Sequence, residues 1–196
     1  GGGVIIPAFA VGRAQGMLYY LHTLRESGRL PHVPVYLDSP MAIEATDILE
    51  RYPNEHRLDR ATCAAVTRSA RYIRDADASR ALDQGDGPKI IIAASGMATG
   101  GRVLHHLEHF APDQRNTILF TGFQAGGTRG DRMLRGEEAV KIHGKMVPIR
   151  AEVASLDSLS AHADYEEILD WLGHLGKPPI ATFVTHGEAD AAESLA

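Results

Sequence analysis

Apolar residues are arranged along the chain in two alternating patterns, short continuous runs and longer stretches with near-helical spacing. Short apolar runs bounded by glycine, proline or polar residues are typical of strands, and apolar positions three or four apart are typical of helices. The runs predict strands at 4–10, 33–37, 89–95, 116–122 and 180–186. The periodic stretches predict helices at 13–27, 40–52, 102–110, 130–136 and 164–175.

Three further segments complete the pattern. Residues 62–66 are predicted to form a short strand, residues 76–84 a helix, and residues 139–153 a hairpin around His143 and Gly144. Strands that alternate with helices indicate an α/β fold, with a Rossmann-like, mostly parallel sheet and helices on both faces. In such a sheet, ligands bind at the carboxyl ends of the strands.

Composition narrows the class of protein. The 196 residues are 44% hydrophobic and 23% charged, as in an ordinary globular protein, and no apolar run approaches the roughly 20 residues of a membrane helix. A single cysteine, Cys63, excludes an intrachain disulfide and a cysteine-cluster zinc site, and it fits a reducing, cytoplasmic location. Both ends of the sequence interrupt an element, so we expect a fragment of a longer chain.

Charge argues weakly against nucleic-acid binding, because the chain carries a net charge of −5. The charge balance is locally reversed over residues 126–150, which contain six arginines and lysines but only three acidic residues. A basic surface could therefore exist on part of the molecule.

Two glycine-rich segments follow apolar strands and are candidates for anion binding. Ser95 and Gly96 open the segment "SGMATGG", and Gly122 opens "GFQAGGTRG", which contains Arg129. Glycine lets backbone N–H groups approach a phosphate closely, although both segments could equally be turns or solvated surface loops. If they bind phosphate, they should emerge at one edge of the sheet, with Arg102 and Arg129 reaching the same anion.

Histidines form two candidate pairs. His105 and His109 are four residues apart on a predicted helix, but no carboxylate partner is evident, so solvated side chains are favoured. His162 precedes a helix and His186 ends a predicted strand, where imidazoles could serve a metal, with Asp164 as an acceptor for one ring. Two unrelated histidines would produce the same spacing.

Six motifs in order resemble the metallo-β-lactamase-fold nucleases that carry a β-CASP insertion. They are "IIPAFAVGRAQ", "VYLDSPMA", "ASGMATGGRVLHHL", "GFQAGGTRGDRML", "SAHAD" and "VTHGE". The likeness is to bacterial and archaeal homologues of the nuclease that processes mRNA 3′ ends, and to RNase J. The HxHxDH motif of that family is absent from this sequence, so the resemblance implies a fragment without the amino-terminal half.

The resemblance implies a division of the chain and roles for its residues. Residues 1–158 would be a β-CASP domain, and residues 159–196 the start of the returning metallo-β-lactamase segment. His162 would act as a general acid or clamp the scissile phosphate, and His186 would ligate one of two zinc ions. Ser160, Ala161 and Asp164 belong to a segment that contacts RNA phosphate in RNase J-like relatives.

The resulting expectation is the lid and RNA-binding side of a zinc-dependent ribonuclease. Its partners would be single-stranded RNA and an amino-terminal metallo-β-lactamase domain in the same polypeptide, with no membrane and with a homodimer among the oligomeric options. The fragment alone would be inactive and would hold no stoichiometric zinc, since one matched ligand falls short of the about three that catalytic sites use. The alternatives are a non-catalytic RNA- or phosphate-binding module and a small-molecule metallohydrolase.

Overall fold

The computed structural model describes residues 2–85, 87–160, 162–185 and 187–195. The chain divides into two compact units, Gly1–Asp157 and Ser158–Ala196. No helix in the described part of the chain is long and apolar enough to cross a membrane.

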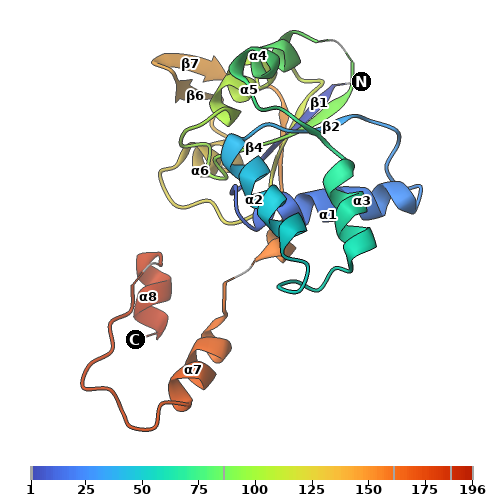
Figure 1. Ribbon diagram of the computed structural model, residues 1–196. Coiled ribbons are helices and arrows are strands. Elements are labelled where there is room, and N and C mark those ends of the chain that lie inside the picture. Colours follow the sequence, from blue (N-terminus) through green and yellow to red (C-terminus); the bar gives the residue numbers. More distant parts are fainter. Residues whose placement is uncertain (1, 86, 161, 186, 196) are drawn as a thin grey trace. The chain divides into compact units, whose positions relative to one another are not determined.

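The first unit is built on a six-stranded sheet in the order β3-β2-β4-β1-β5-β8 (Figure 1). All five strand pairings in this sheet are parallel, which confirms the predicted α/β fold. The strands are β1 (Gly3–Pro7), β2 (Val35–Leu37), β3 (Arg71–Tyr72), β4 (Lys89–Ala93), β5 (Thr117–Phe120) and β8 (Glu152–Ser155).

The central strand β4 shows why a continuous apolar run was required. All five of its residues are buried, because helices cover both faces of the sheet. Successive side chains of a strand point to opposite faces. Ile91 packs in a core cluster with Leu107 of the helix after β4, and its neighbours Ile90 and Ile92 point to the opposite face.

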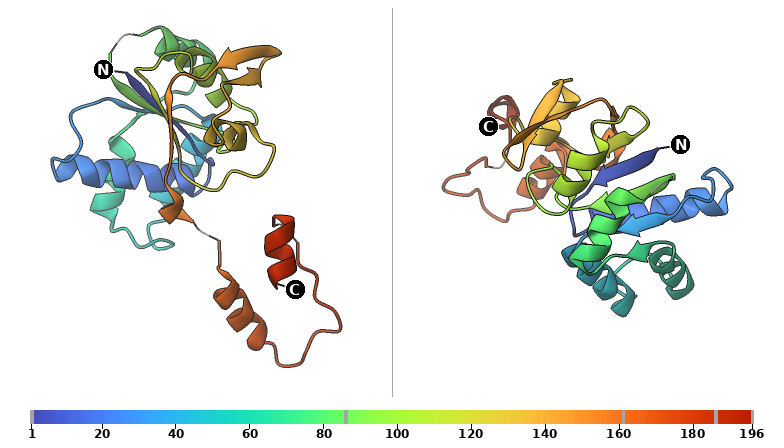
Figure 2. Two further views of the ribbon diagram at one scale, coloured as in Figure 1. Left: turned by 180° about the vertical axis from the view of Figure 1, so that it is seen from behind. Right: turned by 90° about the horizontal axis from the view of Figure 1, so that it is seen from above.

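Helices α1, α2 and α3 pack against one another on one face of the sheet, and α4 and α5 pack together on the other (Figures 1 and 2). Their starts follow local capping signals: Ser39 caps α2, Asp59 caps α3 and Asp75 caps α4 through side-chain hydrogen bonds. The helices are α1 (Arg13–Glu26), α2 (Pro40–Arg51), α3 (Arg60–Arg68), α4 (Ala76–Gln84), α5 (Val103–Phe110) and α6 (Arg129–Leu134).

A two-stranded antiparallel hairpin, β6 (Ala139–Ile142) and β7 (Lys145–Pro148), lies outside the main sheet. It turns at His143 and Gly144, as predicted, and both residues have positive φ angles. The hairpin is anchored by three buried side chains, Val140, Ile142 and Val147, which belong to the same core cluster as Leu104 and Leu107 of α5.

The second unit contains the helices α7 (Tyr165–Gly173) and α8 (Ala189–Leu195), preceded by the short 3-10 helix η1 (Asp157–Leu159). Asp164 accepts a hydrogen bond from Glu167 N (2.9 Å), and the Glu167 carboxylate accepts one from Asp164 N (3.0 Å). This reciprocal pair forms a capping box that fixes where α7 begins.

Three sequence predictions differ from the structure. Residues 62–66 belong to helix α3, whose start is set by the Asp59 cap and whose buried Cys63 and Val66 lie three apart. The last two residues of the predicted hairpin segment, Glu152 and Val153, leave the hairpin and belong to β8, which pairs with β5. Residues 180–185 form no strand, and the described part of the second unit offers no strand for them to pair with.

Gly101 provides a stability test of the loop between β4 and α5. A Cβ at this position would lie 2.4 Å from the carbonyl oxygen of Ala94, and its φ angle is +78°. We predict that Gly101→Ala lowers the free energy of unfolding by about 2 kcal/mol, because both the backbone conformation and the space exclude a side chain.

The adjacent Gly100 is the matched control, since a Cβ there would meet nothing within 4 Å. Gly100→Ala should change the stability by less than about 0.5 kcal/mol in the same denaturant titration. Equal effects at the two positions would show that this loop is not tightly packed.

Candidate functional site

The two glycine-rich loops meet at the carboxyl edge of the sheet. The Gln124 side-chain amide, from the loop after β5, donates hydrogen bonds to the carbonyls of Gly96 (3.1 Å) and Gly122 (3.0 Å). Gly130 N also donates to Met97 O at 3.3 Å. The buried Gln124 therefore joins the loop after β4 to the loop after β5.

Ser95 shapes the first of these loops from within. Its hydroxyl oxygen accepts hydrogen bonds from the backbone N–H groups of Thr99 (3.0 Å) and Gly100 (3.2 Å). The side chain thus stabilises the turn that leads into α5. Direct contact between Ser95 and a substrate stays a prediction.

Aromatic and cationic side chains surround the glycines at this edge. The Phe9 ring, just after β1, packs so closely on Gly96 that a Cβ there would lie 2.8 Å from it. The Arg13 guanidinium lies beside Gly122, 3.6 Å from where its Cβ would be. Phe9 is 49% exposed and Phe123 is 65% exposed. We call the residues Phe9, Arg13, Gly96, Gly122 and Phe123 the exit surface.

Sequence reasoning identified the two glycines of the exit surface but not the other three residues. The available signal was that Phe9 and Phe123 each follow an apolar strand within a glycine-containing motif. The exposure itself could not be known before the fold.

Arg129 is anchored to backbone rather than extended into solvent. Its Nε donates to Lys141 O at 2.5 Å, and its Nη1 donates to Ala98 O (3.2 Å) and Thr99 O (3.3 Å). The side chain therefore braces the loop before α5 against β6. Its predicted contact with substrate is untested.

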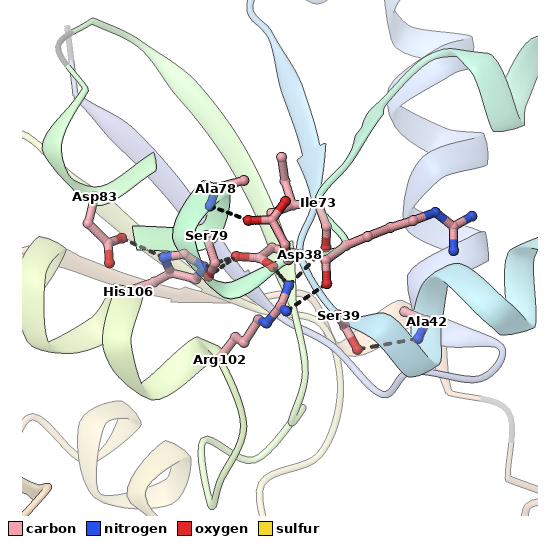
Figure 3. A network of polar contacts seen from close by, with 11 residues as sticks. Asp38, Ser39, Ala42, Ile73, Ala78, Ser79, Asp83, Arg102 and His106 are labelled. Atoms are coloured by element: carbon pink, nitrogen blue, oxygen red, sulfur yellow. Dashed lines mark hydrogen bonds and ion pairs between the residues drawn. The ribbon is translucent and has the colours of Figure 1, made fainter. Parts of the chain in front are cut away.

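A buried network of charges lies where β2 ends (Figure 3). The Asp38 carboxylate is fully buried and accepts hydrogen bonds from Arg102 Nη1 (2.6 Å), His106 Nε2 (2.9 Å) and the Ser79 hydroxyl (2.5 Å). These partners come from α4, from α5 and from the residue that precedes α5. One side chain thus connects β2 to both helices on one face of the sheet.

His106 lies between two carboxylates. Its second nitrogen, Nδ1, is 2.6 Å from Asp83 Oδ1, so both ring nitrogens face acceptors that require an N–H. Burial alone would lower the pKa of His106, but the hydrogen bonds to Asp38 and Asp83 outweigh it and raise the pKa to about 8. Burial likewise opposes ionisation of Asp38, yet its partners His106, Ser79 and Arg102 leave the pKa of that carboxyl below its usual value.

Arg102 corrects one expectation. Its guanidinium does not reach outward to a phosphate but points inward to Asp38, and it also donates to Ile73 O and Arg74 O, each at 2.9 Å (Figure 3). A buried carboxylate must be paired with opposite charge to remain ionised. That requirement, rather than an external anion, determines where Arg102 points.

His105 and His109, the two histidines on the outer side of α5, contact different neighbours. His109 packs edge-on against the ring of Phe110, with centroids 5.0 Å apart. His105 instead lies beside the hairpin turn, near Glu108 and His143. Both side chains are exposed, and the group that could hold a metal contains His105 but not His109.

Five of the predicted residues fall in the second unit or its undescribed positions. His162 N donates to the Ser160 hydroxyl oxygen at 3.2 Å, and Asp164 is occupied in capping α7. His186 and Ala161 lie outside the described residues, so the structure gives no account of them.

The implied zinc pair would need a group of histidine or acidic ligands close to His162. Within the described residues, the group of three or more histidine, cysteine or acidic side chains that could hold a metal is His105, Glu108 and His143. That group does not include His162. The described residues of the second unit therefore do not build the implied catalytic zinc site.

Comparison with known families identifies the two parts of the chain. The family model of the Beta-Casp domain matches residues 14–133, more than half of the chain. The chain belongs to the β-CASP family. A second model, the Zn-dependent metallo-hydrolase RNA specificity domain, matches residues 146–196.

Known relatives extend well beyond this chain. Ribonuclease TTHA0252 of Thermus thermophilus is 40% identical over 97% of this chain and 44% of its own length. The transcription termination factor FttA of Methanosarcina mazei is 34% identical over all of this chain and 32% of its own. An RNase J-like protein of Methanocaldococcus jannaschii is 34% identical over 96% of this chain and 44% of its own. The β-CASP chain thus spans less than half the length of these relatives.

Asp38→Asn tests how much the buried network contributes to the stability of the fold. We predict a loss of about 3 kcal/mol in the free energy of unfolding, because Arg102 and His106 would keep buried positive charge without its partner. Denaturant titration measures this loss. Asp77→Asn removes only an exposed ion pair with Arg80 and should cost less than about 0.5 kcal/mol. Similar losses for the two variants would contradict the network's importance.

The raised pKa of His106 predicts a pH dependence of stability. A group whose pKa is higher in the folded state stabilises the fold fully below its unfolded pKa, and this contribution is lost as pH rises through the folded pKa. Folding raises the pKa of His106 from the usual 6.5 to about 8, so the free energy of unfolding should fall by about 2 kcal/mol as the pH rises through this range and beyond it. Denaturation midpoints from pH 6 to 9, in chelator-treated buffer, measure it. His106→Gln should flatten the profile, and an unchanged slope in that variant would assign the titration elsewhere.

Proposed function

We propose that the chain is the RNA-binding lid of a zinc-dependent ribonuclease that acts on single-stranded RNA. The observation that carries this proposal is the succession of a β-CASP match and an RNA specificity domain match along one chain. The name of the Thermus relative, a ribonuclease, supports the same activity. In the longer protein, a metallo-β-lactamase domain of the same polypeptide would form the other side of the cleft.

The exit surface has the chemistry that single-stranded RNA requires. Exposed aromatic rings such as Phe9 and Phe123 stack on bases without regard to sequence. Arg13 offers a cation beside Gly122, where the missing side chain leaves backbone accessible to a phosphate. This combination needs only local positive charge, so the net charge of −5 does not oppose it.

His162 is proposed as the group that donates a proton to the leaving alkoxide oxygen of the cleaved phosphodiester. Ser160, Ala161 and Asp164 would line the RNA phosphate next to it. His186 is proposed as a ligand to a zinc pair held mainly by the metallo-β-lactamase domain, and zinc in such a pair polarises the phosphodiester.

A non-catalytic RNA-binding module is the second candidate. It is favoured by relatives whose names describe transcription termination factors rather than nucleases. The two candidates share RNA binding and differ only in whether His162 transfers a proton.

RNA binding by the exit surface can be measured on this chain alone. We predict that Phe9→Ala and Phe123→Ala each weaken binding of a fluorescent oligouridylate about tenfold, the value of one lost stacking contact. Tyr20 lies on α1 about two turns after Arg13, and its ring is about as exposed as that of Phe9. Tyr20→Ala should therefore leave the affinity unchanged. If all three variants bind like the unmodified chain, the exit surface is not the RNA site.

His162→Ala tests the catalytic role in a protein that joins this chain to its metallo-β-lactamase domain. Loss of a general acid should lower the rate of RNA cleavage by about 10²–10⁴-fold with the zinc content unchanged. Loss of zinc with retained activity per bound ion would make His162 a ligand instead. RNA binding without any cleavage by the unmodified protein would support the non-catalytic module.

A further inference from the structure

A cluster of metal-binding side chains lies on the outer side of α5, distinct from the buried network and the exit surface. His105 and Glu108 are three residues apart on this helix, and His143 comes from the turn of the β6–β7 hairpin. One ligand atom from each of the three lies within 4.8 Å of the other two. His143 Nδ1 is 2.9 Å from Glu108 Oε2, and the rings of His105 and His143 have centroids 4.5 Å apart.

The packing of the hairpin brings His143 to the helix. Ile142, next to it in sequence, is fully buried in the same core as Leu104 and Leu107 of α5. Residues three apart on a helix share a face, so His105 and Glu108 point together toward the turn. The fold therefore brings the three groups near one another, and His143 and Glu108 also form a hydrogen bond.

The backbone at His143 is that of a two-residue hairpin turn. Its φ angle is +45°, and that of Gly144 is +82°. Asparagine or glycine adopts such a turn position at lower cost than histidine, for which the left-handed region is unfavourable by about 1 kcal/mol. A two-residue hairpin turn of this kind requires positive φ at both central residues, so the conformation belongs to the turn that carries His143.

We propose that His105, Glu108 and His143 form a zinc site that fastens the hairpin to α5. Two imidazoles and one carboxylate are a donor set that Zn²⁺ takes with a position left open for water or another ligand. Ligands around tetrahedral zinc lie about 3.3 Å apart, so exposed His105 and His143 need only small side-chain rotations. The site uses none of the residues to which the family resemblance assigns a role, so it stands or falls independently of the proposed ribonuclease function.

One neighbouring charge opposes the site. Lys145 Nζ lies 3.7 Å from Glu108 Oε1, and together with His143 it already offers positive charge to that carboxylate. The lysine is largely exposed and can turn into water when a divalent ion takes its place. The competing structure is a surface ion pair between Glu108 and protonated His143, with no metal.

Zinc titration of the chelator-stripped chain decides between these structures. In place of the sequence-based expectation that this chain holds no stoichiometric zinc, we expect binding of about one Zn²⁺ per chain at this cluster. The melting temperature should rise by roughly 5 °C when zinc is about 100 times above its Kd. His143→Asn should abolish this rise. The same variant should melt no lower than the unmodified chain without zinc, because asparagine suits the turn.

Two controls locate the effect. His109→Ala changes a histidine on the same helix outside the cluster and should keep the zinc response. The double variant His162→Ala, His186→Ala removes the histidines of the "SAHAD" and "VTHGE" motifs and should also keep the zinc response. A zinc response that survives His143→Asn, or one that disappears in the double variant, would overturn the proposal; so would the absence of any response in the unmodified chain.

Discussion

The buried carboxylate of Asp38 is the interaction on which the arrangement of the first unit depends. It lies at the end of β2 and holds Ser79 of α4, His106 of α5 and Arg102 at the start of α5. Removing one partner of such a group leaves uncompensated charge in a low-dielectric interior, which costs far more than an exposed ion pair. The position and rotation of α5 are therefore set from within the core.

That single helix connects the parts to which we assign function. Its inner side carries His106 to the carboxylates, and the loop before it contains Ser95 and Gly96 of the carboxyl edge. Its outer side carries His105 and Glu108 to the hairpin turn. The edge proposed to bind RNA and the cluster proposed to bind zinc thus share one rigid support. Sites on such supports are better preorganised than sites on free loops.

Sequence patterns predicted the elements whose signals are local. The apolar run at 89–95 became a fully buried central strand, and the serine–proline start of α2 appears where it was expected. The short segment 62–66 was ambiguous, because few residues separate a strand pattern from a helical one, and the decisive Asp59 cap lies outside it. Strand β8 was missed because its only pairing, with β5, joins residues 35 apart, such as Thr117 and Glu152.

The candidate sites show the same limit more sharply. Parallel strand order was enough to expect that the loops containing Gly96 and Gly122 would meet. No spacing rule could reveal that Arg102 turns inward to Asp38, 64 residues away in sequence, or that His143 meets Glu108 across 35 residues. Direction and long-range contact come from packing, and these decide which histidines and arginines are available to a ligand.

The most direct test of the account is chemical-shift mapping of the 21.2 kDa chain during titration with a single-stranded oligouridylate. The account predicts that the backbone amides of Phe9, Arg13, Gly96, Gly122 and Phe123 shift together with one apparent Kd, while those of α4 and the β6–β7 hairpin do not. Shifts confined to α4 and the hairpin, or none at all at saturating RNA, would contradict the assignment of the carboxyl edge as the RNA-binding surface.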